Sequence, residues 1–90
     1  MILSLRRARL ERQPVFADLQ DWQVLEDGNE IGRIYEQHAP ASPDQAWFWS
    51  ITVPLDMRAK VVTSGRAPTI DQAKQDFLKS WSAWTAWLSR

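Results

Sequence analysis

The fold is decided by residues 68–88, which read PTIDQAKQDFLKSWSAWTAWL. Apolar side chains recur here every three or four residues, which is the spacing of one face of an α-helix. The members of this stripe are Ile70, Ala73, Phe77, Trp81, Trp84 and Leu88. At about 100° per residue they lie within about 40° of the direction of Phe77. We therefore predict a helix over residues 69–89 that packs on the rest of the chain through this stripe.

The start of this helix carries its own local signal. Thr69 follows Pro68, and a threonine hydroxyl in this position accepts a hydrogen bond from a free backbone amide of the first turn. Gln72 stands three residues later, where it suits a capping box, and Asp71 suits the positive end of the helix dipole. The signal predicts that the helix begins directly after Thr69.

Residues 22–36 are typical of a β-hairpin, because the turn signal Asp27-Gly28-Asn29 separates two runs rich in strand-forming residues. With a two-residue turn, one face would carry Trp22, Val24, Ile31, Arg33 and Tyr35, and the other would carry Leu25, Gly32 and Ile34. A three-residue turn would exchange the faces of one strand, so the assignment of faces stays open.

Aromatic and β-branched residues predict another strand over residues 47–53, with Trp47, Trp49, Ile51 and Val53 turned toward the helix. A shorter strand is expected over residues 60–64, ending at Gly65. The basic segment 1–13 fits either a helix or a strand, and we favour an added strand. The expected fold class is α+β, with an antiparallel sheet of three or four strands packed on one long C-terminal helix in a single domain over residues 1–90.

Composition argues against several classes of protein. The chain has no cysteine, which fits a reducing compartment, and we expect the cytoplasm. No apolar run approaches the ~18 residues of a membrane span, and arginines follow the short apolar opening instead of preceding it. We therefore expect neither a transmembrane helix nor a signal peptide. Eleven basic and eleven acidic residues cancel, which lowers the expectation of strong nucleic-acid binding.

Residues with catalytic chemistry do not form a coherent set. His38 is the only histidine, so it has no partner for a histidine metal site, and we interpret it as a solvated loop residue. The chain lacks a G-x-S-x-G nucleophile elbow, and Gly28, Gly32 and Gly65 are too far apart for a phosphate loop. We expect no enzymatic activity, no cofactor and no metal.

Four apolar residues are the candidates for binding a partner. Trp87 lies about 80° from the centre of the helical stripe, where a large ring can anchor a partner protein. Phe48, Leu25 and Ile34 are expected on the sheet face opposite the helix, which one helix cannot also cover. We predict a non-catalytic module that binds another protein, or a second copy as a homodimer, through these four residues.

Nucleic-acid binding is the alternative. Guanidinium groups pair with phosphates and aromatic rings stack on bases. The residues for this role come from the first segment and the sheet, and they are Arg6, Arg7, Arg9, Arg33, Lys60 and Arg66. We rank this function second, because the acidic hairpin would repel phosphate and the tryptophans are expected in the core.

Four segments carry a resemblance to known proteins: Gly32-Arg33-Ile34-Tyr35-Glu36, Trp47-Phe48-Trp49-Ser50, Ser64-Gly65-Arg66-Ala67-Pro68-Thr69, and Ala73-Lys74 with Phe77 and Ser80-Trp81. Over about residues 20–84 the chain resembles a group of short uncharacterised proteobacterial proteins. The resemblance implies this fold and a bacterial origin, and it brings no known activity. By topology the chain also resembles HicB-like antitoxins, double-stranded RNA-binding domains and the arm-binding domains of phage-type integrases. The integrase-like modules imply DNA contact from the sheet around Arg33.

Overall fold

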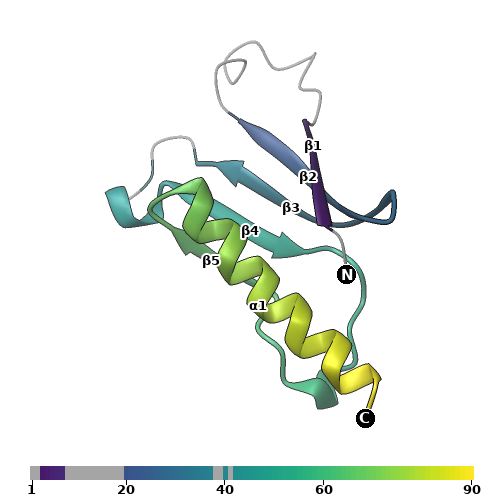
Figure 1. Ribbon diagram of the computed structural model, residues 1–90. Coiled ribbons are helices and arrows are strands. Elements are labelled where there is room, and N and C mark those ends of the chain that lie inside the picture. Colours follow the sequence, from purple (N-terminus) through teal and green to yellow (C-terminus); the bar gives the residue numbers. More distant parts are fainter. Residues whose placement is uncertain (1–2, 8–19, 38–39, 41) are drawn as a thin grey trace.

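The computed structural model describes residues 3–7, 20–37, 40 and 42–90. A five-stranded antiparallel sheet, with its strands in sequence order, packs on one C-terminal helix (Figure 1). The elements are β1 (Leu3–Arg7), β2 (Asp21–Glu26), β3 (Asn29–Glu36), the 3₁₀ helix η2 (Pro43–Gln45), β4 (Trp47–Ile51), the 3₁₀ helix η3 (Met57–Ala59), β5 (Ser64–Ala67) and α1 (Ile70–Leu88). The predicted α+β class is confirmed, and the sheet has one strand more than the upper prediction of four.

The extra strand is β1, and it confirms the preference for a strand at residues 3–7. β1 pairs antiparallel with β2, so that Leu5 lies opposite Val24. Arg9 and the rest of the basic segment, like His38 in the later loop, lie outside the described residues.

α1 begins where the capping signal predicts. The Thr69 hydroxyl accepts a hydrogen bond of 3.1 Å from the backbone N–H of Gln72. The side chain of Gln72 donates to Asp76 at 2.9 Å, one helical turn onward, so it does not turn back to close the capping box. The threonine alone therefore fixes the first turn.

The apolar stripe of α1 packs mainly on β3, β4 and β5. Ala73, Phe77 and Trp81 are buried, and the ring of Phe77 meets that of Trp49 edge-on at 6.0 Å between centroids. The Trp81 indole N–H donates to Glu26 at 2.8 Å, which ties the helix to the end of β2. The prediction that Leu88 belongs to the buried stripe is wrong: it is 57% exposed, because the last turns of α1 extend past the strands (Figure 1).

The β2–β3 hairpin has the predicted two-residue turn, with positive φ at Asp27 (51°) and Gly28 (85°). The predicted faces are wrong, because a β-bulge breaks the register between Val24 and Leu25. Leu25 lies opposite Glu30, while the preceding residue, Val24, lies opposite Gly32. Ile31, between Glu30 and Gly32, is therefore the extra residue of the bulge. One extra residue changes the face of everything that follows it. On β2 and β3 the side toward the helix consequently carries Trp22, Val24, Gly32 and Ile34.

The last two strands also differ in part from expectation. Trp47, Trp49 and Ile51 are buried toward α1 as predicted, and β4 ends at Ile51. The strand predicted over residues 60–64 is wrong, because Lys60 has a left-handed backbone (φ 53°) and caps η3. β5 starts only at Ser64, and the residue after it, Gly65, lies opposite Trp49.

Candidate functional site

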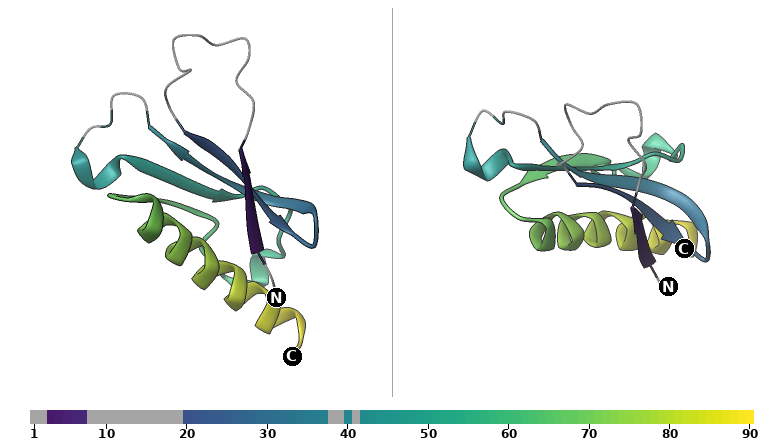
Figure 2. Two further views of the ribbon diagram at one scale, coloured as in Figure 1. Left: turned by 45° about the horizontal axis from the view of Figure 1, so that its top comes forward. Right: turned by 90° about the horizontal axis from the view of Figure 1, so that it is seen from above.

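α1 does not cover the full width of the sheet. The helix lies over β3, β4 and β5, whereas β2 and β1 continue the same face beyond it (Figure 2). A helix is about 10 Å wide and neighbouring strands are about 4.8 Å apart, so one helix covers two or three strands. The apolar side chains of Leu3 and Leu5 on β1 are therefore only half-buried.

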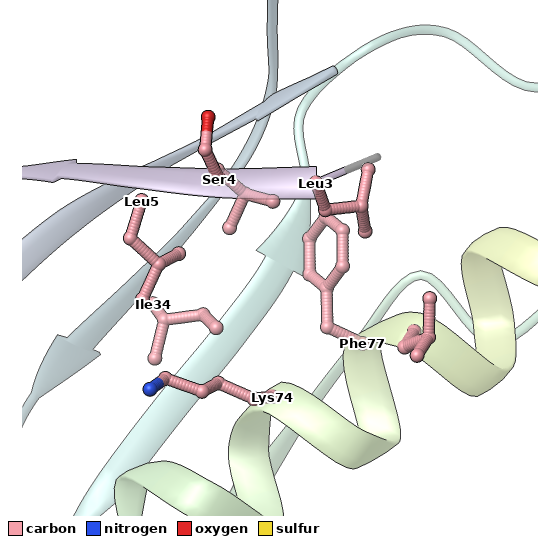
Figure 3. A pocket seen from close by; sticks show the side chains of 8 residues that line it. Leu3, Ser4, Leu5, Ile34, Lys74 and Phe77 are labelled. Atoms are coloured by element: carbon pink, nitrogen blue, oxygen red, sulfur yellow. The ribbon is translucent and has the colours of Figure 1, made fainter. Parts of the chain in front are cut away.

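A trough of about 360 Å³ lies between α1 and β1 (Figure 3). Its lining residues are Leu3, Ser4, Leu5, Val24, Ile34, Lys74, Phe77 and Leu78. Val24, Ile34 and Phe77 are almost fully buried and form its floor, while Leu78 on the helix wall is 47% exposed. We call this feature the β1 trough. Its volume is near the lower end of the ~300–1,000 Å³ range of ligand sites in proteins.

Basic side chains lie on both elements that flank the β1 trough. Lys74 stands on the helix wall, and its ammonium is 3.9 Å from the carboxylate of Asp71, whose side chain is 83% exposed. Such a surface pair is weak, so the Lys74 ammonium can still meet another carboxylate. β1, which forms the opposite wall, ends in Arg6 and Arg7, both exposed. Arg7 lies on the helix side of the sheet and Arg6 on the other face. An acidic partner is therefore favoured at this place.

The outer edge of β1 adjoins the same trough. β1 is the first strand in the order of the sheet, and no described strand pairs with its outer side. Alternate residues of an edge strand direct their backbone N–H and C=O groups outward, where another strand can pair with them. Backbone groups and apolar side chains thus lie side by side at one rim of the molecule.

The face of the sheet away from α1 is polar, with one aromatic cluster. Arg33 forms a two-point ion pair with Asp21, one bond of which is 3.0 Å. The Tyr35 and Phe48 rings lie 5.2 Å apart, and the guanidinium of Arg66 lies 5.4 Å from the centre of the Phe48 ring. We call these last three residues the Phe48 cluster.

The four predicted partner-binding residues do not form one surface. Leu25 and Phe48 lie on the face away from α1 as predicted, but Leu25 is only 8% exposed. The placement of Ile34 on that face is wrong: the bulge turns it toward the helix, where it is 1% exposed. Trp87 lies near the end of α1, stacked on Trp84 at 5.4 Å.

The basic residues of the nucleic-acid alternative are also divided. Arg6, Arg33 and Arg66 share the face away from α1, on β1, β3 and β5. Arg7 lies opposite Trp22 on the other face, and Lys60 caps η3. Arg9 lies outside the described residues.

The β1 trough was not predicted from the sequence. Leu78 stands one position beside the predicted stripe, and Leu3 and Leu5 lie in a segment whose structure was ambiguous. The width of the helix relative to the sheet could have indicated the trough, because one helix covers only two or three strands and leaves part of a larger sheet uncovered.

Asp56 and Arg58 connect η3 with the end of α1. The Asp56 carboxylate accepts the Arg58 backbone N–H at 2.9 Å and its guanidinium at 2.6 Å. That guanidinium lies 5.8 Å from the centre of the Trp87 ring, which also has the Arg90 guanidinium at 3.9 Å. The hydrogen bonds from Arg58 lower the pKa of Asp56 from 3.8 to about 2.

This shift predicts a pH-dependent contribution to stability. The folded pKa lies below the unfolded value, so the contribution is present above pH 3.8 and is lost as the pH falls toward 2. Asp56→Asn keeps an oxygen that can cap η3 but removes the charge. We expect the variant to unfold at lower urea concentration than the parent near neutral pH, with the gap closing below about pH 2. A gap that is constant over this range would show that the charge contributes nothing.

In the described part of the chain, no three His, Cys, Asp or Glu side chains gather as metal ligands, and no helix is long and apolar enough to cross a membrane. In comparisons with protein-family models, with curated proteins and with solved structures, nothing matches the chain. The function proposed below therefore rests on the geometry of the β1 trough and the surfaces around it.

Proposed function

We propose that this protein is a non-catalytic interaction module that binds another protein through the β1 trough. The observation that carries the proposal is the uncovered half of the helix side of the sheet, where Leu3, Leu5 and Leu78 remain partly exposed over an apolar floor. Contiguous exposed apolar surface with a charged rim is typical of sites that are covered by a partner.

The outer edge of β1, with which no described strand pairs, supports a protein as the occupant of the trough. A small apolar ligand would bury the side chains of the trough and leave the outward backbone groups of β1 without a new partner. A polypeptide can cover the apolar side chains and also pair with the backbone groups of β1, because it carries both side chains and backbone hydrogen-bonding groups.

Site-specific photo-crosslinking in the native cells tests this function. We expect p-benzoylphenylalanine in place of Leu78 to give an adduct of one defined mass. The same group in place of Leu88, which is exposed on the same helix but distant from the trough, should not. An adduct of twice the mass of the chain would identify a second copy as the partner. Adducts from position 88 alone would contradict the proposal and favour the surface around Trp87.

Nucleic-acid binding is the second candidate, and the Phe48 cluster favours it. Two adjacent rings and a guanidinium on an open sheet face suit stacking on bases. It ranks second because Arg33, the central arginine of that face, is already paired with Asp21. Binding of a single-stranded oligonucleotide that weakens steeply with salt, by a protein that stays monomeric, would reverse this order.

A further inference from the structure

We infer that the occupant of the β1 trough is an extended segment of another protein, which adds to the outer edge of β1 as a sixth strand and alternates apolar with acidic residues. This inference rests on the proposed function and specifies the partner. It combines the outer edge of β1, with which no described strand pairs, the apolar trough beside it and the basic residues at the end of β1 and on α1.

The strand edge determines the conformation of the partner. β1 has five residues and pairs with β2 on one side only among the described strands. A segment that pairs with its other side must itself be extended, and at about 3.4 Å per residue it spans about 17 Å along β1. Five to seven residues are on the order of the length required.

The pleat of the sheet determines the alternation. Leu3 and Leu5 point toward the helix side, while Ser4 and Arg6 between them lie on the other face. In an added strand every second side chain likewise lies on the helix side, next to Leu3 and Leu5 and facing Leu78. Those positions favour apolar residues, and the intervening positions lie beside Arg6.

The basic residues of β1 and α1 determine which charge is favoured at the polar positions of the added strand. Arg6 lies on the face away from α1, beside the intervening positions of an added strand, whereas Arg7 and Lys74 lie on the helix side of the sheet. Opposite charges across a strand pair attract and like charges repel, so glutamate or aspartate is favoured in the partner. A second copy is disfavoured, because β1 contains no acidic residue and would bring no opposite charge to Arg6 and Arg7.

A peptide titration followed by amide NMR tests the inference. The probe is a peptide of about seven residues in which Glu alternates with Val. Its comparison peptides carry Lys for Glu, or N-methyl groups on every second amide. At low salt we expect the Glu peptide to shift the β1 amides and to bind at least about tenfold more tightly than either comparison peptide.

Charge reversal on β1 provides the decisive variant. In the double variant Arg6→Glu, Arg7→Glu the preference should change to the Lys peptide. Arg66→Glu makes a like change of charge at the far edge of the sheet on β5 and should keep the original preference. Retention of folding is checked by the amide spectrum of each variant.

Three results would overturn the inference: equal binding of the Glu and Lys peptides, equal binding of the N-methylated peptide, or shifts confined to β5. If crosslinking from position 78 persists in any of these cases, the interaction function stands and only the extended acidic strand is wrong. If that crosslinking is also absent, the proposed function fails with it.

Discussion

Gly32→Ala should lower the free energy of unfolding by about 3 kcal/mol or more. This is a large part of the ~5–15 kcal/mol that is usual for a folded protein. Gly32 lies in β3 opposite Ile51, directly beneath α1. A Cβ atom at this position would overlap both the ring of Phe77 and the backbone oxygen of Ser50. The oxygen belongs to β4, so relief of the overlap requires a shift between two central strands. Urea unfolding followed by tryptophan fluorescence measures the effect.

Gly28→Ala is the matched control for this variant. Gly28 lies in the hairpin turn with φ at 85°, and nothing comes within 4 Å of the position of an added Cβ. Alanine there is strained only in its backbone, at a cost of about 1–2 kcal/mol. If Gly32→Ala were no less stable than Gly28→Ala, the packing around β3 would not be close enough to exclude a Cβ atom at position 32.

The helix was predictable because its signals are local. The apolar period, the Thr69 cap and the proline before it all lie within one stretch, and α1 follows them to within one residue at each end. Leu88 is the exception, because its exposure depends on where the sheet ends and not on the helix. Local pattern determines the element, while the rest of the fold determines which of its residues are covered.

The faces of the hairpin were not predictable for a different reason. The turn at Asp27-Gly28 was recognised, yet a single extra residue at the bulge moved Ile34 from the open face to the core. Because side chains alternate with a period of two, an error of one residue reverses every later assignment. No pattern around Ile31 distinguishes a bulged from a regular pairing.

The β1 trough could not be read from the sequence because it depends on the number and order of strands. Leu5 and Leu78 are far apart in the chain and meet across one cleft only when β1 lies at the edge beyond the reach of α1. The strand near the N-terminus was expected correctly, but its position at the edge of the sheet, which creates the trough, was not predicted.

Phe77→Ala should cost about 3–5 kcal/mol, because the side chain is 1% exposed and its removal leaves a cavity in the core. The lost ring contacts Trp49 edge-on and fills the space above Gly32. Leu78→Ala, at the adjacent and 47% exposed position, is the control and should cost no more than about 1 kcal/mol. Urea unfolding of both variants provides the comparison, and equal losses would mean that Phe77 is not the centre of the helix–sheet contact.

The double variant Gly32→Ala, Phe77→Ala tests the contact between these two residues directly. Removing the ring takes away one of the two overlaps that alanine at position 32 creates, while the overlap with the Ser50 oxygen remains. The combined loss should therefore be smaller than the sum of the single losses, by at least about 0.5 kcal/mol. Strict additivity would mean that the loss of stability in Gly32→Ala comes entirely from the overlap with the Ser50 oxygen of β4. Glycine at position 32 would then be required by the pairing of β3 with β4 and not by the packing of α1 on β3.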